Sequence, residues 1–443
     1  MLRRIVLKGY KSFPEHDLHL EPFCVLFGPN AAGKSNFLDA IQLIGRLARC
    51  STLKDAFAPP YRGTALESFT FPPNGIKGLL EQHSARMSFE VDVELSDAVV
   101  RKIDQLVRDM KSTRIAAESS EPYGGKTESQ YVKERFLRYR IEIEVLPKSG
   151  ILRVVDEYLA ALNAKGEPRS SRHPFLEKVG GKLHLRMEGR AHPRYHDVHL
   201  DRSVLSMPHY APHCPHLAAM QEQLSRWCIF YFEPRERMRM TNPVRDVSHI
   251  GLMGEELAAF LNTLRSVDER QLRGVEKAIH AIVPSITGLD INVNDLGEVE
   301  LRIREGNATI PARVVSEGTL RILGLLALGA TKQPLPLIGF EEPENGVHPR
   351  RVRLIAELLR NRAEEGATQI IVTTHSRILP DLIPDKHLYV CRRVKGKSEI
   401  TPLSTWRPCA RTDINQDARD AKQSADKGTL LTSQRIMRGD FDA

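Results

Sequence analysis

A glycine-rich segment near the N-terminus has the residue types and the spacing of a phosphate-binding loop. It matches the pattern G-x-x-x-x-G-K-[ST], follows the apolar residues 23–27 and precedes apolar residues at helical spacing from position 37 onward. This order of strand, loop and helix is the context that such a loop requires, and a glycine-rich turn that matches by chance is the alternative. The residues expected to bind a nucleotide here are Gly28, Pro29, Asn30, Ala31, Ala32, Gly33, Lys34, Ser35 and Asn36.

Each part of this loop has its own physical role. Glycines let backbone N–H groups surround a β-phosphate, and the N-terminus of the following helix adds the positive end of its dipole. We expect the Lys34 ammonium to reach the β- and γ-phosphates and the Ser35 hydroxyl to bind Mg²⁺. The loop therefore predicts ATP and Mg²⁺ as cofactors and places Lys34 among the catalytic residues.

Two consecutive carboxylates follow a second apolar segment much later in the chain. Residues 337–340 lead into Glu341, Glu342 and a turn-like Pro-Glu-Asn-Gly sequence. Hydrolysis of a phosphoanhydride needs a neutralising metal and a positioned water molecule. We assign Glu341 to the metal shell and Glu342 to the general base, while an acidic turn exposed to solvent is the alternative.

A third apolar segment, residues 369–374, ends in His375 and Ser376. The ends of parallel strands line the crevice in which nucleotides bind. A neutral imidazole forms hydrogen bonds with a γ-phosphate or with the attacking water, so His375 is a candidate catalytic residue that senses the terminal phosphate. A histidine with a purely structural role is the alternative at a strand end.

The surrounding pattern predicts an α/β fold that brings these strand ends together. Helical and apolar strand-like segments alternate at the end of the chain, which indicates a mostly parallel sheet flanked by helices. Apolar residues alternate with polar ones over positions 89–95 and 141–145, which is typical of an antiparallel β-lobe. We also expect a hairpin that turns near residues 294–297. The predicted segments are 1–85 with the P-loop, 86–225 with the β-lobe and an inserted lid region, and 226–443.

The inserted region is the least regular part of the sequence. Residues 111–128 contain few apolar side chains and predict a mobile loop, and residues 166–215 show little periodicity. One cluster within it could hold zinc, although a polar surface loop is the favoured alternative because prolines interrupt it. The members of this cluster are His209, His213, Cys214 and His216.

Composition limits the classes of protein to consider. The chain has 443 residues, 41% hydrophobic and 27% charged, which is the balance of a folded globular protein. Its longest apolar run, residues 322–330, is too short to cross a bilayer core of about 30 Å, so we expect no membrane and a cytoplasmic location. The six cysteines form no C-x-x-C pair and predict reduced thiols. The net charge of +8 permits contact with DNA without requiring it.

The motifs together resemble the ABC-type ATPases of the SMC/RecF/OLD group, and most closely the short bacterial AAA-type ATPases without a long coiled coil. The resemblance covers residues 1–45 and 225–400 in the family's order, and residues 50–225 only in outline. Besides the P-loop it is carried by a basic segment at 8–13, Ser-Glu-Gly-Thr at 316–319, Glu-Glu-Pro-Glu-Asn-Gly-Val-His-Pro at 341–349 and Thr-Thr-His-Ser at 373–376.

This resemblance implies an ATP site shared by two copies of the chain. Ser316 and Gly318 of one copy would contact the γ-phosphate bound to the P-loop of another, so a homodimer or a higher homo-oligomer is expected. Two residues differ from the broader ABC pattern: Glu341 replaces the usual Asp, and Glu317 replaces a Gly. Gln82 is the candidate for the family's Q-loop glutamine, with an exposed loop residue as the alternative.

Three classes of function fit these motifs. The first is an ATPase that regulates a separate effector such as a nuclease, or acts on DNA, in repair or anti-phage defence. Only 68 residues follow His375, which is short for the nuclease domain that OLD-type relatives append. The second class is the nucleotide-binding subunit of an ABC transporter, which the long insertion disfavours. The third is a scaffold that binds nucleotide without hydrolysis, against which the Glu341–Glu342 pair argues.

Overall fold

A six-stranded sheet with the order β10-β15-β16-β3-β17-β18 forms the centre of the molecule. The computed structural model describes residues 1–118, 130–331, 333–405 and 432–437. The pairings from β10 to β17 are parallel, and only β18 pairs in the antiparallel sense. Every residue of β3, β10 and β16 is buried, as expected for parallel strands covered on both faces. The strands are β3 (Phe23–Phe27), β10 (Trp227–Phe230), β15 (Leu337–Glu341), β16 (Gln369–Thr374), β17 (Leu388–Val394) and β18 (Lys397–Pro402).

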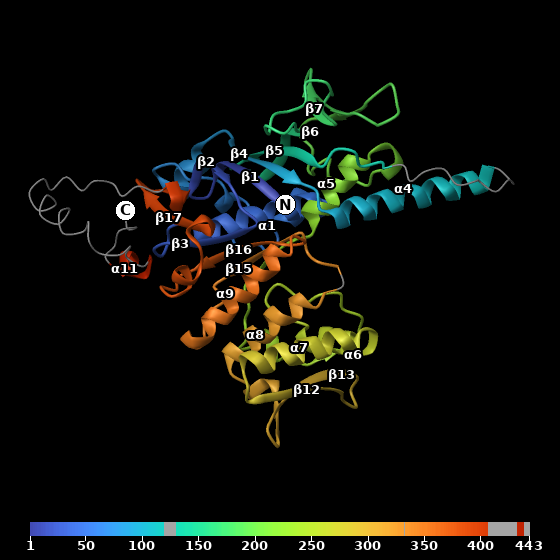
Figure 1. Cartoon of the computed structure of the whole chain (residues 1–443). Helices are drawn as coiled ribbons and strands as arrows, with labels where there is room; N and C mark the ends of the chain where they lie inside the picture. The colour runs from blue at the N-terminus through green and yellow to red at the C-terminus, as the bar shows by residue number, and fades with distance from the viewer. Residues whose placement is uncertain (119–129, 332, 406–431, 438–443) are drawn as a thin grey trace, which may run out of the picture.

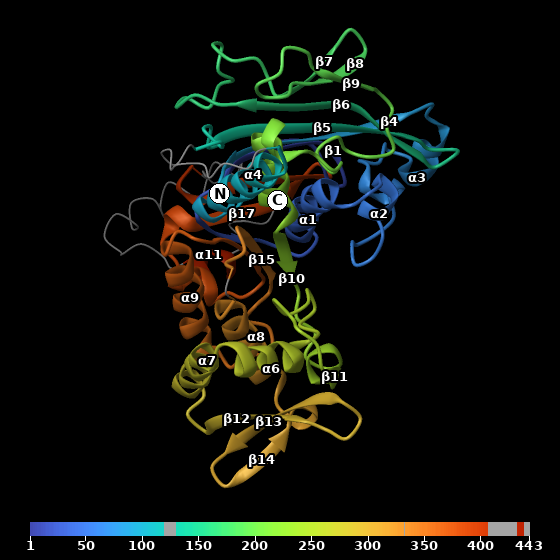
Figure 2. The ribbon, with the colours of Figure 1, turned by 90° about the vertical axis from the view of Figure 1, so that its right-hand side faces the viewer.

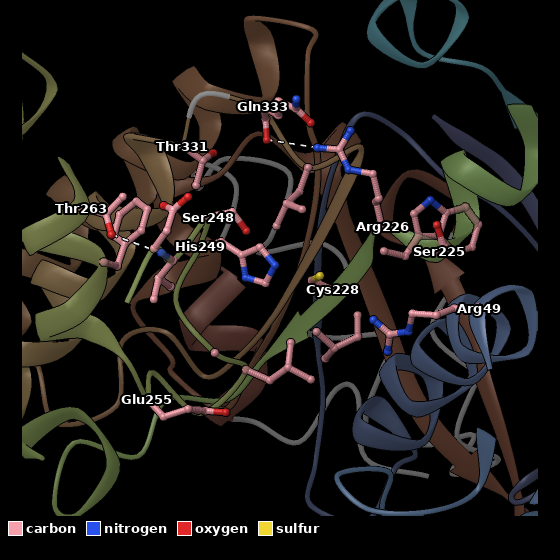
Figure 3. A pocket seen from close by; sticks show the side chains of 18 of the residues that line it. Arg49, Ser225, Arg226, Cys228, Ser248, His249, Glu255, Thr263, Thr331 and Gln333 are labelled. Carbon is pink, nitrogen blue, oxygen red and sulfur yellow. Dashed lines mark hydrogen bonds between the residues drawn. The ribbon is translucent and has the colours of Figure 1, made fainter. Parts of the chain in front are cut away.

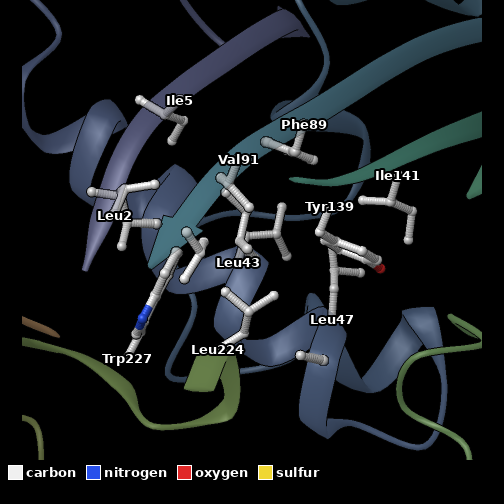
Figure 4. Close-up of a cluster of buried hydrophobic side chains, with 14 of the residues drawn as sticks. Leu2, Ile5, Leu43, Leu47, Phe89, Val91, Tyr139, Ile141, Leu224 and Trp227 are labelled. Atoms are coloured by element: carbon white, nitrogen blue, oxygen red, sulfur yellow. The ribbon is translucent and has the colours of Figure 1, made fainter. Parts of the chain in front are cut away.

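An eight-stranded antiparallel sheet lies on one side of this central sheet, with α1 (Lys34–Arg49) between the two (Figures 1 and 2). Leu43 and Leu47 of α1 face Val91 and Tyr139 of the antiparallel sheet in one continuous apolar core (Figure 4). In sheet order the strands are β2 (Phe13–His19), β1 (Leu2–Tyr10), β4 (Ala85–Glu94), β5 (Phe136–Leu146), β6 (Ile151–Ala161), β7 (Leu176–Val179), β8 (Lys182–Leu185) and β9 (Arg194–Asp197).

A second lobe extends from the opposite side of the central sheet (Figure 2). It combines a small antiparallel sheet with helices, and its apolar residues continue into the core beneath β15 and β16. Its strands are β11 (Asn242–Pro243), β12 (Ile286–Val293), β13 (Glu298–Glu305) and β14 (Ala308–Pro311), and its helices are α6 (Leu257–Val267), α7 (Glu269–Ile282) and α8 (Glu317–Gly329). Helix α9 (Pro349–Glu364) follows β15 of the central sheet and contacts β16 and β3.

The remaining helices border the antiparallel sheet. They are α2 (Leu53–Ala56), α3 (Gly75–Glu81), α4 (Asp97–Glu118) and α5 (Pro215–Ser225). A separate short helix, α11 (Thr432–Met437), lies near the C-terminus of the sequence. Within the described ranges, none of the helices combines the length and the apolar character needed to cross a bilayer.

The predicted fold class is confirmed, and so are the β-lobe and the hairpin, in which Gly297 turns the chain with a φ of 73°. One expectation for the inserted region was wrong in part. Helix α4 continues through residue 118, and only the remainder of the predicted loop at 111–128 lies outside the described residues. The region 166–215, whose sequence shows little periodicity, contains three four-residue strands with at most two buried side chains each. The division into three segments stays a prediction.

The antiparallel sheet has a buried acid that fixes the loop after β9. Glu157 is fully buried and accepts hydrogen bonds from the Tyr139 hydroxyl at 2.8 Å, the Ser203 hydroxyl at 2.7 Å and the Val204 N–H at 2.7 Å. We expect Glu157→Ala to lower the free energy of unfolding by about 3 kcal/mol, because it leaves several buried donors unpaired. Urea unfolding measures the loss, with the exposed Asp197→Ala on β9 as the control. A change within about 0.5 kcal/mol would contradict this role.

Candidate functional site

The P-loop follows directly from β3 and depends on two glycines. Gly28 has a φ of 147°, and a Cβ on it would lie 1.9 Å from the carbonyl oxygen of Cys391 on β17. Gly33 has a φ of 108° and is the N-cap of α1, where no side chain caps the helix. Only glycine adopts these backbone angles without strain. The first N–H groups of α1 therefore stay available to an anion, which is the geometry predicted for the loop.

Lys34 lies inside this loop with only 4% of its surface exposed. Its ammonium donates hydrogen bonds to the carbonyl oxygens of Gly28 and Pro29, both at 2.8 Å. Burial lowers the pKa of Lys34 to about 8, against the opposite effect of nearby groups that include Glu342 and Glu341. A cation that is already dehydrated and held by weak carbonyl partners is suited to bind phosphate oxygens.

Ser35 and Glu341 lie together, as expected for a pair that binds a metal. The Ser35 hydroxyl donates a hydrogen bond to the carboxylate of Glu341, which ends β15. A hydroxyl and a carboxylate are the hard oxygen ligands that Mg²⁺ prefers, so these two residues fit the predicted cation. Glu341 is also bound by Arg62, whose guanidinium lies 3.0 Å from the second carboxylate oxygen.

Glu342 and His375 also meet at this edge of the sheet. Glu342 has a φ of 49° and its N–H donates to the carbonyl oxygen of Thr373 at 2.9 Å, which ties the turn to β16. Its carboxylate lies 3.2 Å from Nε2 of His375, whose Nδ1 lies 3.4 Å from the ammonium of Lys34. Burial, then the charge of Lys34, lowers the pKa of His375. Burial and Lys34 favour a neutral imidazole, which donates from Nε2 to Glu342 and keeps Nδ1 unprotonated toward Lys34.

The two signature residues lie apart from the P-loop of their own chain. Ser316 is exposed and caps α8, where its hydroxyl oxygen accepts the N–H of Thr319 at 3.2 Å. Gly318 is buried, and a Cβ on it would lie 2.5 Å from the carbonyl oxygen of Gly346. Among the described residues, no hydrogen bond joins either of them to the loop of residues 28–36. The structure therefore brings together Lys34, Ser35, Glu341, Glu342 and His375, whereas Gly318 packs on the turn after Glu342 and the described hydrogen bonds of Ser316 stay at the start of α8.

The sequence did not identify three side chains at the site. Arg62 bridges Glu341 and Asp39 with contacts of 3.0 Å, and Lys11 binds the other oxygen of Asp39 at 2.8 Å. Asp39 is placed by α1, where it follows the P-loop by one helical turn. Arg62 had no signal in the sequence, because it belongs to a proline- and glycine-rich stretch without a motif.

The candidate for the Q-loop residue is not supported by its position. Gln82 is exposed where α3 ends, and among the described residues no hydrogen bond joins its side chain to Ser35 or Glu341. The residue that follows β10 is Tyr231, and the pairing of Phe230 with Phe340 places it beside Glu341. Burial raises the pKa of Tyr231, and both Arg62 and Glu341 are among the charged groups that act on it.

One cavity adjoins these residues, and another lies elsewhere in the molecule. The first, of about 1020 Å³, adjoins Ser35 and Asn36 and is bordered by several cations, namely Lys11, Arg62, Arg393, Lys395 and Lys397. The second, of about 630 Å³, lies between β10 and α6, with Arg49 and Arg226 on one side and His249 near its centre (Figure 3). The residues lining the second cavity include none of the predicted site residues. The first cavity is therefore the one of the two that predicted site residues line.

The histidine-rich cluster is a structural element rather than a surface loop. His216 is fully buried, lies 2.6 Å from the carboxylate of Glu188 and accepts the N–H of Glu134 at 3.0 Å. Cys214 is also buried, so the favoured expectation of a polar surface loop was wrong for these two residues. In the described part of the chain, no group of three His, Cys, Asp or Glu residues could hold a metal ion.

The strand order, the loop after β3 and the acids after β15 define a P-loop fold like that of an SMC head. Residues 23–150 and 190–379 match the family model described as "AAA domain, putative AbiEii toxin, Type IV TA system". The chain belongs to this family.

More distant relatives agree with this assignment. The chain is 21% identical over 400 residues to a protein named "OLD nuclease" from Thermus scotoductus, and the match covers 86% of this chain but only 60% of that relative. A crystal structure of an SmcHead bound to the C-winged helix domain of ScpA matches with a TM-score of 0.54 and 14% identity, over 90% of this chain and 97% of that one. At this identity the structural match supports the fold alone.

Loss of the P-loop lysine tests the nucleotide site directly. We expect Lys34→Ala to weaken ATP binding by about 100-fold or more, because the phosphates lose their one buried ammonium partner in the loop. Isothermal titration calorimetry with Mg·ATP measures the affinity, and Lys54→Ala, an exposed lysine on α2, serves as the control. Wild-type affinity in Lys34→Ala would contradict the P-loop assignment.

The protonation state of His375 is a second test. Because burial and Lys34 lower its pKa, we expect the nucleotide-free protein to titrate His375 with a midpoint below 6.5. The imidazole is then neutral at pH 7 and becomes charged only in more acidic solution. NMR of labelled histidines measures the midpoint, with His375→Gln assigning the signal. A midpoint above 6.5 would show that the Glu342 carboxylate dominates instead.

Proposed function

We propose that this chain binds Mg·ATP at the P-loop and hydrolyses it with Glu342 as the general base. The observation that carries the proposal is the series Lys34, His375 and Glu342, with contacts of 3.4 Å and 3.2 Å between neighbours. In this arrangement Lys34 binds the phosphates, His375 orients the terminal phosphate or the water, and Glu342 accepts the proton of the attacking water. The membership of an AAA-domain family supports ATP as the nucleotide.

Ser35 and Glu341 would hold the cation. Mg²⁺ bound there neutralises charge on the phosphates as the bond breaks. The side chain of Glu341 is one methylene longer than the aspartate usual in ABC proteins, so its contact to the cation would pass through a water molecule. Arg62 keeps the Glu341 carboxylate paired in the nucleotide-free chain, which limits the cost of a half-buried anion.

The complete site would use residues of a second copy of the chain. Ser316 is exposed and lies at the N-terminus of the 13-residue helix α8, and its described contacts are all within that helix. A face-to-face dimer would bring this N-terminus against the γ-phosphate held by the other copy, where the helix dipole stabilises negative charge. ATP would then join the two copies, and hydrolysis would release them.

The joining and release of the two copies would act on a separate partner or on DNA. The family's description contains a putative toxin of a toxin–antitoxin system, and a relative is named as a nuclease, which supports a role in defence or repair. The match covers 60% of that relative's length, and its nuclease activity is a property of that protein. The solved SmcHead is bound to a domain of ScpA, which shows that a head of this fold can take a protein partner.

Replacing the base tests hydrolysis separately from binding. We expect Glu342→Gln to lower the rate of ATP turnover by about 100-fold or more, while ATP binding is kept and a dimer accumulates in Mg·ATP. Phosphate release and light scattering measure the two effects, and Glu357→Gln on α9 is the matched control. Removal of Mg²⁺ with EDTA should abolish turnover in the wild type. Unchanged turnover in Glu342→Gln would reject the base assignment.

A further inference from the structure

A third acid in the same turn lies where no role has been assigned to it. Glu344 is two residues beyond Glu342, and only 9% of its surface is exposed. The hydroxyl of Thr374 donates a hydrogen bond to its Oε1. The other carboxylate oxygen, Oε2, is buried and has no hydrogen-bond partner within the described parts of the chain. A buried carboxyl group that is only half satisfied is costly, so its presence requires an explanation.

The partners of Glu344 lie on both sides of His375. Thr374 precedes the histidine, and the oxygen of its hydroxyl accepts the N–H of Ser376, the next residue after the histidine, at 2.9 Å. The pKa of Glu344 is raised by burial and further by the negative charge of Glu342, whereas the hydrogen bond from Thr374 opposes this effect. The carboxyl group therefore fixes the backbone from which the His375 side chain extends.

The turn that carries Glu344 is itself closed by backbone hydrogen bonds. The N–H of Asn345 donates to the carbonyl oxygen of Glu342 at 3.1 Å, and the N–H of Val347 donates to that of Glu344 at 3.0 Å. These bonds hold Glu342 and Glu344 at fixed positions relative to each other. A contact from Glu344 to Thr374 consequently sets His375 at a fixed distance from Glu342.

We propose that Glu344 is a positioning residue, which through the Thr374 hydroxyl holds His375 between Glu342 and Lys34. The inference rests on the proposed function for its effect on turnover, but the geometry it describes exists in the nucleotide-free chain. Glu344 does not touch the phosphates, so its loss alters the alignment of His375 and leaves the binding of ATP to Lys34 and Ser35 in place.

Two variants break the contact from opposite ends. Glu344→Ala removes the acceptor and Thr374→Val removes the donor. Each should lower kcat by about 10-fold or more, while KM and the Kd for ATP change by less than about 3-fold. Thr374→Ser keeps the hydroxyl and should restore most of the rate. Thr401→Val, which alters a threonine on β18 whose hydroxyl has no described partner, is the matched control.

A double-mutant cycle shows whether Glu344 acts through His375. In a His375→Ala background, Glu344→Ala should lower kcat no further, because the residue it positions is already gone. Wild-type kcat in both Glu344→Ala and Thr374→Val, or a full additional loss in the His375→Ala background, would overturn the proposal. If Glu344→Ala does not fold, Thr374→Val and Thr374→Ser carry the test.

A readout without nucleotide separates this inference from the proposed function. In Thr374→Val the NMR titration midpoint of His375 should move from its lowered value toward 6.5, because the ring leaves Lys34 and its partly desolvated position. An unchanged midpoint would overturn the positioning role. If the midpoint moves while the wild type turns over ATP no faster than Glu342→Gln, the hydrolytic function fails and the positioning role stands.

Discussion

The parallel pairing of β3, β16 and β15 determines where every group of the site lies. Phe27 pairs with Thr374, and Thr373 pairs with Glu341, so the three strands end at the same edge of the sheet. In a parallel sheet the carboxyl ends of neighbouring strands form a common crevice. The P-loop, the acids and His375 come from distant parts of the sequence, and this register is what brings them within hydrogen-bonding distance of one another.

Lys34, Arg62, Glu341 and Asp39 each lie near an opposite charge at this edge. Lys34 is balanced by Glu341 and Glu342, and Arg62 joins Glu341 to Asp39. Two charges 4 Å apart near a protein surface interact by about 4 kcal/mol, which is enough to offset much of the cost of removing each from water. The nucleotide-free site is therefore already organised, and binding ATP exchanges partners within it rather than building it anew.

The sequence was sufficient for the parts of the site that are local in the chain. Lys34 and Ser35 belong to one loop, and Glu341 and Glu342 to one strand end, so motif and context are visible together. The position of Tyr231 beside Glu341 and the contact of Glu344 with Thr374 arise from the pairing of distant strands, and the contact of Arg62 with Glu341 joins a loop to a strand far along the chain. No periodicity or spacing encodes such contacts. The four-residue strands β7 to β9 were missed for a different reason, since each is too short to show alternation.

Gly318 shows how closely the signature helix is joined to the acids. A Cβ there would lie 2.5 Å from the carbonyl oxygen of Gly346, so the first turn of α8 rests on the backbone of the turn that carries Glu342 and Glu344. Closely packed interiors transmit displacement rather than absorb it. A shift of α8 toward this turn must therefore move the acids as well. Gly318 is therefore required for packing within one chain, independently of any contact with phosphate. Ser316 is exposed, so close packing does not restrict its side chain.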